Sequence, residues 1–289
     1  MLKASVMQGA GKEAVSVQSK VSVDPATAIG LLAGFGCLVV SFMMEGGRLD
    51  ALMNPSAALI VFGGTLGATL LSSPYRLLLN LPRAIVRAFL PRVSDDLQLI
   101  GLISSLADVA RRDGLLALES KCEGLDDPFL ERGVQLVVDG AEPEVVREVL
   151  EVEIEQLEAR HAASYGVLEA MGGFSPTMGI IGTVMGLINV LGSLSDPSEL
   201  GPAIAVAFIA TLYGVGTANL LWLPLAGKLR KQSEQEETSR QLMLHGLLAI
   251  QAGENPRVIR EKLLGFLPPS RRAPKQNKAA AESATEEKN

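Results

Sequence analysis

The chain has 289 residues, of which 48% are hydrophobic, 4% aromatic and 20% charged, and its formal net charge is −6. So large an apolar fraction excludes a chain that is disordered throughout. Two cysteines exclude a disulfide scaffold, and two histidines argue against a dedicated zinc or haem site, so we expect no cofactor. The negative charge also argues against nucleic acid as the main partner.

Four uncharged hydrophobic runs dominate the sequence. Each is about 19 to 24 residues long and lacks Asp, Glu, Lys and Arg. Because a helix needs about 20 apolar residues to cross roughly 30 Å of hydrocarbon, we expect transmembrane helices rather than buried core helices. The first run is too long for a cleaved signal peptide and lacks a basic segment directly before it. The runs are 25–44, 55–73, 171–194 and 201–223.

The distribution of Lys and Arg predicts the orientation. Segments 74–170 and 224–289 contain ten and twelve of them, whereas loop 45–54 contains one and loop 195–200 none. The positive-inside rule therefore places both long segments and the N-terminus in the cytoplasm. The predicted fold is an all-α membrane protein with four transmembrane helices in a 2+2 arrangement and a helical cytoplasmic domain.

This interpretation divides the chain into six parts. They are a cytoplasmic N-terminal leader (1–24), a first transmembrane hairpin (25–73), a cytoplasmic helical domain (74–170), a second transmembrane hairpin (171–223), a cytoplasmic helical extension (224–267) and a disordered tail (268–289).

The cytoplasmic segments carry helical patterns. Residues 75–90 are amphipathic and follow the second run directly, which favours an interfacial helix, with Pro82 arguing against one unbroken helix. Ser94 is expected to cap a helix that ends before Gly114. Residues 142–170 should run into the third membrane run, and residues 228–250 should continue the fourth.

Small residues recur at a spacing of four in the membrane runs. This spacing lets helix backbones approach closely, either between copies in an oligomer or within one chain, and the pattern leaves both open. The positions are Gly30 and Gly34, Gly63 and Gly67, Gly182 and Gly186, and then Ala210, Gly214 and Ala218.

Two threonines should lie at the same depth in the membrane. Thr183 is 12 residues beyond Met171 and Thr211 is 12 residues before Leu223, which puts both about 18 Å above the cytoplasmic edge at 1.5 Å per residue. They could line one polar path, or each could bond a carbonyl of its own helix. Because the runs contain no ionisable group, ion transport would require a carboxylate from another chain.

Two prolines lie toward the cytoplasmic side of the third and fourth runs. Pro176 lies inside the third run, and Pro224 directly follows the fourth. A proline removes a backbone hydrogen bond and favours a kink, and a static kink is the simplest interpretation of each.

Three extended segments resemble the MotA family of flagellar stator subunits. They are MEGGRLDALMNPSAALIVFGGTLGAT, GGFSPTMGIIGTVMGLINVLGSL and GPAIAVAFIATLYGVGTANLLWLPLAGKLRK, and the resemblance covers roughly residues 25 to 265. It implies a multi-pass protein of the inner membrane with both termini in the cytoplasm. It also implies a homo-oligomer, a pentamer around a dimer of a MotB-like single-span subunit that supplies the ion-binding Asp. Ion flow would turn this ring against a FliG-like rotor protein.

The resemblance also implies roles for individual residues. Pro176 and Pro224 match the prolines that couple ion passage to cytoplasmic movement, and Thr183 and Thr211 match the hydroxyl positions of the ion path. Arg111 and Glu119, in RRDGLLALE, and Glu153 match rotor-interacting charges. Because a threonine at the position of Thr183 is typical of sodium-driven members, the transported ion is expected to be Na⁺ rather than H⁺.

Other functions fit the sequence less well. An ExbB- or TolQ-like energy transducer is the main alternative, although those relatives resemble three-span proteins. A solute transporter would be expected to place polar binding groups in both halves, and the first two runs carry few. The chain contains no GxxxxGK[ST], HExxH or GxSxG motif, so we do not expect an enzyme.

Overall fold

The computed structural model describes residues 20–21, 24–90, 92–93, 95–122, 125–192 and 197–272. Almost all of them are helical, as predicted, and the described exceptions include two paired two-residue strands, β1 (Lys20–Val21) and β2 (Arg92–Val93). Most of the predicted leader 1–24 and tail 268–289 lies outside the described residues. The chain forms two compact units, one from 21–91 with 157–234 and one from described parts of 92–156 with 235–289.

Four helices are long and apolar enough to cross a membrane. By length and composition they are Pro25–Met44, Leu49–Ser72, Pro143–Gly192 and Leu200–Gln251. The predicted membrane helices are therefore present, and their 2+2 arrangement and the domain boundaries remain predictions. The helical pattern predicted before the third span does form one 50-residue helix with it, and the fourth span continues to residue 251.

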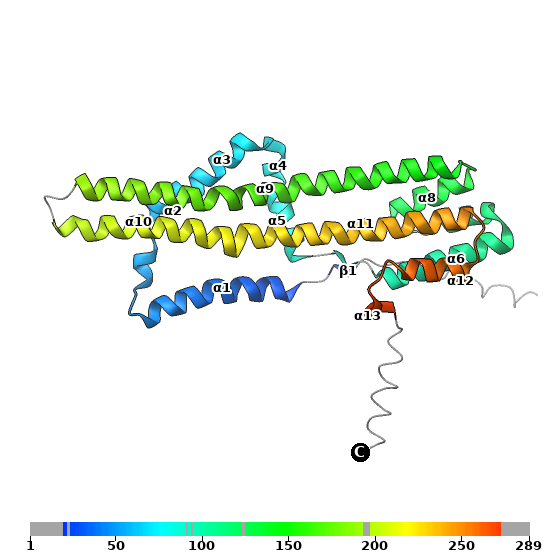
Figure 1. Ribbon diagram of the computed structural model, residues 1–289, viewed down its shortest axis with the longest axis horizontal. Coiled ribbons are helices and arrows are strands. Elements are labelled where there is room, and N and C mark those ends of the chain that lie inside the picture. The colour runs from blue at the N-terminus through cyan, green and yellow to red at the C-terminus, as the bar shows by residue number, and fades with distance from the viewer. Residues whose placement is uncertain are drawn as a thin grey trace, which may run out of the picture. The chain divides into compact units, whose positions relative to one another are not determined.

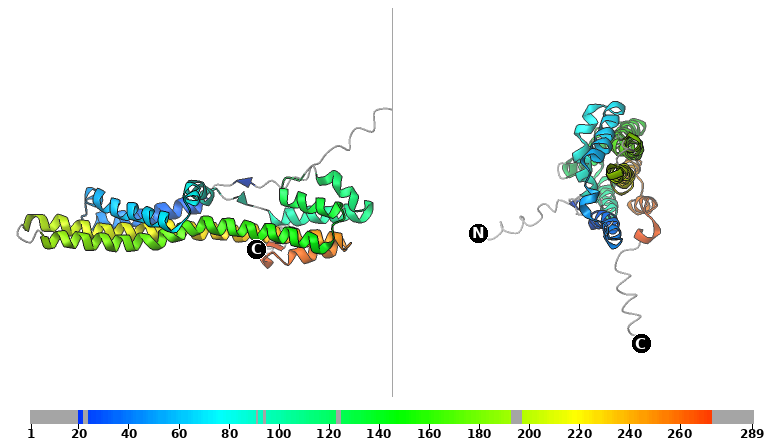
Figure 2. Two further views of the ribbon diagram at one scale, coloured as in Figure 1. Left: turned by 90° about the horizontal axis from the view of Figure 1, so that it is seen from above. Right: turned by 90° about the vertical axis from the view of Figure 1, so that its left-hand side faces the viewer.

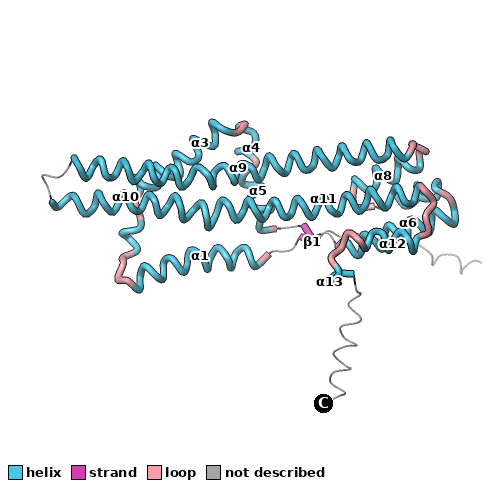
Figure 3. Tube along the Cα trace, viewed as in Figure 1, coloured by secondary structure: helices cyan, strands magenta, loops and turns pink. Residues whose placement is uncertain are grey.

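The first unit contains all four membrane runs. It comprises α1 (Pro25–Met44), the 3₁₀ turn η1 (Leu49–Leu52), α2 (Pro55–Ala58), the π-helical turn η2 (Leu59–Gly63), α3 (Gly64–Ser72), α4 (Tyr75–Leu79) and α5 (Leu81–Phe89). It also takes in the later part of α9 (Pro143–Gly192), α10 (Pro197–Thr217), the π-helical turn η4 (Ala218–Trp222) and the start of α11 (Leu223–Gln251). Here α9 and α10 lie side by side, and a turn joins α1 to η1 (Figures 2 and 3).

Two sequence-based boundaries move in the structure. Helix α10 begins at Pro197, within the predicted turn at 195–200, and residues 193–196 lie outside the described chain. The cap of α6 (Asp96–Asp113) is Asp95 rather than Ser94, because the Asp95 carboxylate accepts hydrogen bonds from the amides of Leu97 and Gln98 at 3.1 and 3.4 Å. The helix ends where predicted, before Gly114, whose φ of 87° favours glycine.

The second unit is a small helical domain with its own core. Its elements are α6, η3 (Leu115–Leu118), α7 (Glu119–Cys122), α8 (Pro128–Val138), the start of α9, the end of α11, α12 (Pro256–Leu264) and α13 (Pro269–Arg272). Fully buried side chains from several of these helices form one cluster, including Ile103, Phe129, Leu150 and Leu247. Burial raises the pKa of the Cys122 thiol, which makes this cysteine an inert part of the core.

The amphipathic segment after α3 docks onto protein. It breaks at Asn80 into α4 and α5, with Pro82 in the first turn of α5, where the missing N–H costs nothing. Ala84 and Ala88 are buried in a cluster with residues of α9 and α11, including Leu168 and Leu225. The predicted apolar face thus packs against other helices, since periodicity identifies an apolar face but not what covers it.

One ion pair fixes the N-terminal end of α1. Lys228 of α11 bonds the Asp24 carboxylate at 2.5 Å and also the Thr27 hydroxyl. Asp24 caps α1 through the Ala26 amide, and its own amide donates to the Phe89 carbonyl at the end of α5. Three elements therefore meet at this point, and the bond from Lys228, followed by that from the Ala26 amide, lowers the pKa of Asp24.

We predict that Lys228→Met lowers the thermal stability of the protein in a pH-dependent way. Because folding lowers the pKa of Asp24, its stabilising effect is present above its ordinary value of 3.8 and is lost as the pH falls through the folded value. Unfolding midpoints in detergent should differ between wild type and variant at neutral pH and converge in acid. Lys231→Met, at an exposed lysine nearby, is the control. Equal midpoints for wild type and Lys228→Met at neutral pH would contradict the role of this ion pair.

Candidate functional site

The two threonines predicted to share a depth contact each other. The hydroxyls of Thr183 on α9 and Thr211 on α10 form a hydrogen bond. The Thr183 hydroxyl also lies 3.1 Å from the Gly179 carbonyl, four residues back, and 2.9 Å from the Ala207 carbonyl across the helix interface. Both threonines are half-buried. A polar path between the two helices is therefore compatible with a bond from the hydroxyl to its own helix, because the Thr183 hydroxyl reaches both α9 and α10.

A second hydroxyl pair lies further along the same interface. Ser175 and Thr217 are buried, and their hydroxyl oxygens are 2.9 Å apart. Ser175 also donates to the Gly214 carbonyl at 3.0 Å, and Thr217 to the Tyr213 carbonyl at 2.6 Å. Since these hydroxyls are enclosed and satisfied, they fix the register of α9 against α10 next to Pro176.

Glycines allow these hydrogen bonds to form. A Cβ atom built on Gly214 would lie 2.5 Å from the Ser175 carbonyl oxygen, and one on Gly179 would lie 2.9 Å from the Ala210 carbonyl oxygen. At Gly186 it would lie 2.7 Å from the Cβ of Ala207. Such distances leave no room for a side chain, so α9 and α10 touch backbone to backbone along this stripe.

Tyr213 ties α10 to the turn between the first two membrane runs. Its hydroxyl donates to the Leu52 carbonyl and accepts from the Asn54 amide at 3.2 Å. The Asn54 side chain in turn caps α2, and the Tyr213 ring lies 6.1 Å from the ring of Phe62. This tyrosine therefore anchors the first hairpin to the helix that carries Thr211.

Both prolines lie within continuous helical segments. Pro176 is inside α9. Pro224 is the second residue of α11 and follows η4, a five-residue π-helical turn at Ala218–Trp222. A π-helical turn and a proline each interrupt the regular pattern of backbone hydrogen bonds, and here the two adjoin.

The three charges matched to rotor contacts differ in their surroundings. Arg111, in the last turn of α6, and Glu119, at the start of α7, are exposed and form no salt bridge with any described residue. Glu153 instead pairs with Arg132 of α8 at 3.4 Å. Arg111 lines an open cleft together with Arg257 and Arg260 of α12. The first two charges are therefore available to a partner, whereas the Glu153 carboxylate is already paired within its own unit.

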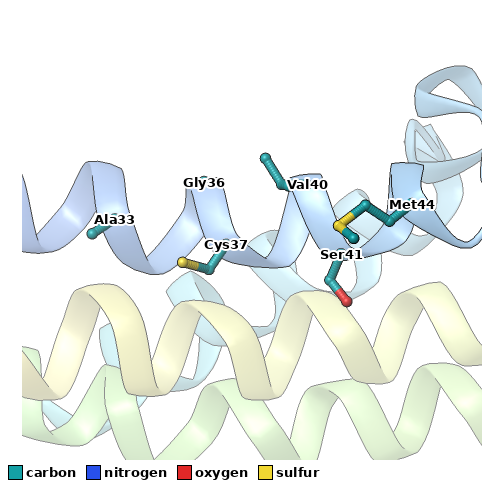
Figure 4. Close-up of a pocket in the computed structure, with 6 residues that line it drawn as sticks. All are labelled: Ala33, Gly36, Cys37, Val40, Ser41 and Met44. Carbon is teal, nitrogen blue, oxygen red and sulfur yellow. The ribbon is translucent and has the colours of Figure 1, made fainter.

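A shallow groove runs along α1. Figure 4 shows Cys37 and Ser41 pointing from α1 toward the neighbouring helix, and all six lining residues belong to α1. The groove shares no residue with the hydroxyl pairs. Within the described residues, no group of three His, Cys, Asp or Glu side chains could hold a metal ion.

Comparison with known proteins finds similarity along most of the chain. The family model of the MotA/TolQ/ExbB proton channel family matches residues 121–242, and the model of the motility protein A N-terminal region matches residues 28–114. Motility protein A of Bacillus subtilis (strain 168) is 38% identical over 247 residues, which cover 85% of this chain and 92% of that protein. The chain belongs to the MotA family.

A further relative and two solved structures are also similar to this chain. Chemotaxis protein PomA of Vibrio alginolyticus is 37% identical over 251 residues, covering 87% of this chain and 98% of that protein. The flagellar MotAB stator complex from Bacillus subtilis contains a chain that is 38% identical, with a TM-score of 0.79 and coverage of 86% and 98%. A chain of C. jejuni MotAB has a TM-score of 0.82 at 28% identity, with coverage of 87% and 99%.

The MotA-family positions form separate groups in this structure. Thr183 and Thr211 meet in the membrane unit, and Arg111, Glu119 and Glu153 belong to the other unit. The roles assigned to these residues and to the two prolines stay predictions. The sequence shows Ser175 and Thr217 as polar residues of the third and fourth runs, but sequence reasoning did not pair them. It also missed Gly179, although a glycine three residues before Gly182 and seven before Gly186 marks the same helix face.

We predict that Gly214→Ala destabilises the fold. The new methyl group would meet the backbone of α9 at Ser175, so we expect a loss of about 1–3 kcal/mol. Gly216→Ala is the matched control, because nothing lies within 4 Å of its Cβ position. Unfolding in detergent measures both. Equal stability of the two variants would show that the helices are not in backbone contact.

Proposed function

We propose that this chain is an ion-conducting subunit of a flagellar stator, in which ion flow drives rotation of a ring of subunits. The observation that carries the proposal is the uncharged contact of α9 with α10, which presents paired hydroxyls within membrane-length helices. Family membership supports it, because relatives include motility protein A, PomA and chains of MotAB stator complexes.

The proposal requires a partner with an acidic side chain. The four membrane runs contain no Asp, Glu, Lys or Arg, and a cation crossing hydrocarbon needs a charged or strongly polar ligand. A MotB-like single-span subunit would supply that Asp, in keeping with the MotAB complexes among the structural relatives. Five copies of this chain would surround two copies of the partner in the inner membrane, with their termini in the cytoplasm.

The driving force is adequate for this mechanism. One elementary charge crossing 100 mV releases about 2.3 kcal/mol, which biases a two-state element by roughly fifty-fold. The continuous helix from α10 through η4 into α11 joins the threonine site to Pro224 and Lys228. A change at the ion site would therefore reach the cytoplasmic end of the membrane unit along one helix.

Sodium is the proposed ion. A hydroxyl oxygen replaces part of the hydration shell of a hard cation, and Thr183 and Thr211 offer two such oxygens at one point. A proton would need no such coordinating oxygens.

We predict that Thr183→Ala lowers the apparent sodium affinity of motility. The change removes one of the two oxygens and leaves Thr211 in place. Swimming speed against sodium concentration, in a strain that lacks its own stator subunit, measures the effect, and half-maximal speed should need several-fold more sodium. Thr177→Ala is the control, because the exposed Thr177 hydroxyl bonds only the carbonyl of Phe174 in its own helix. Unchanged sodium dependence of Thr183→Ala would refute the assignment of the ion.

Rotor contact is proposed for the exposed charges of the second unit. We predict that Arg111→Glu or Glu119→Lys reduces torque while membrane assembly remains normal, since both side chains are exposed and support no described salt bridge. Rotation of tethered cells measures torque, and Arg147→Glu, at another exposed arginine of the same unit, is the control. Normal torque in both reversals would show that other residues contact the rotor.

The ExbB- or TolQ-like transducer is less well supported. One matching family model covers that wider group, but a second matches the N-terminal region of motility protein A over residues 28–114. That region contains the additional hairpin α1–α3. No observation favours a solute transporter or an enzyme.

A further inference from the structure

The segment 74–90 follows a membrane helix directly, and its charged side chains are all positive. It contains three arginines, Arg76, Arg83 and Arg87, and no Asp or Glu. All three arginines are exposed, and none forms a salt bridge with a described residue. Among the described residues, their one polar side-chain contact is from Arg76 to the hydroxyl of its neighbour Tyr75, at 3.3 Å.

Exposed apolar side chains lie among these arginines. Leu79, Val86 and Leu90 are 72%, 54% and 37% exposed, and Tyr75 is 62% exposed. They follow the outer side of α4 and α5, because the opposite side, with Ala84 and Ala88, is buried against α9 and α11. The outer surface therefore mixes guanidinium groups with apolar groups, a combination that suits the boundary between headgroups and acyl chains.

The position of segment 74–90, directly after a membrane helix, favours lipid as its binding partner. Helix α4 begins at Tyr75, three residues after α3 ends at Ser72 (Figure 1). Because α3 is the end of a membrane-length span, the outer surface of α4 starts next to the membrane. The docked inner face holds the arginines in place. A guanidinium forms paired hydrogen bonds with a phosphate group, and unpaired arginines next to a cytoplasmic leaflet attract anionic lipid.

We propose that the outer surface of α4 and α5 is a binding site for the headgroups of anionic phospholipids, in which Arg76, Arg83 and Arg87 bind the phosphate and Leu79, Val86 and Leu90 contact the upper acyl chains. This inference goes beyond the proposed function and does not depend on it, since it requires only that α3 crosses the membrane. The site would hold the cytoplasmic end of the first hairpin at a fixed depth.

Lipid binding by the full-length chain in neutral detergent tests the proposal. Native mass spectrometry would compare retention of phosphatidylglycerol with that of phosphatidylcholine. The wild type should prefer phosphatidylglycerol, and the preference should weaken with added salt. Each arginine next to an anionic lipid contributes about fivefold in affinity. The preference should therefore fall at least tenfold in a triple variant with Arg76→Gln, Arg83→Gln and Arg87→Gln.

The matched control replaces three exposed arginines of the other unit, Arg112, Arg257 and Arg260, by Gln, with the same change in net charge. It should keep the wild-type preference. If the triple variant fails to fold, the single variants Arg83→Gln and Arg87→Gln replace it. An undiminished preference in the α4–α5 variants, an equal loss in the control, or equal displacement by inorganic phosphate would overturn the proposal.

Discussion

The backbone contact between α9 and α10 is the constraint on which the rest of the membrane unit depends. Gly179, Gly186 and Gly214 remove the side chains that would separate the helices. Only at that separation does the Thr183 hydroxyl reach both Thr211 and the Ala207 carbonyl. The contact thus creates a polar point without placing any charge in hydrocarbon, where an unpaired ionised group would be costly.

The same contact ties the threonine pair to the far end of the membrane unit. Ser175 and Thr217 bond across it beside Pro176, and α10 continues without a gap through η4 into α11. Past Pro224, Lys228 joins α11 to the capped end of α1 and, through Asp24, to the end of α5. A chain of hydrogen bonds and one continuous helix therefore connects the threonines to the membrane boundary.

Much of the fold could be predicted from the sequence, because uncharged 20-residue runs and a fixed rise per residue leave little freedom. The same rise predicted the matched depth of Thr183 and Thr211. Other features have no local signal. Asp24 and Lys228 are 204 residues apart in sequence, so no local pattern indicates their ion pair. The only sequence feature that accompanies the π-helical turn η4 is Pro224, which follows it closely. The apolar face of α5 was visible, but whether protein or lipid covers it depends on α9 and α11.

The central claim is that this chain provides polar oxygens and its partner provides the charge. Ion flux into liposomes at an imposed membrane potential tests it most directly, with this chain alone or together with a MotB-like single-span subunit. The account predicts little sodium or proton flux from the chain alone and robust flux from the complex, which is lost when the membrane Asp of the partner is replaced by Asn. Robust flux from the chain alone would contradict it.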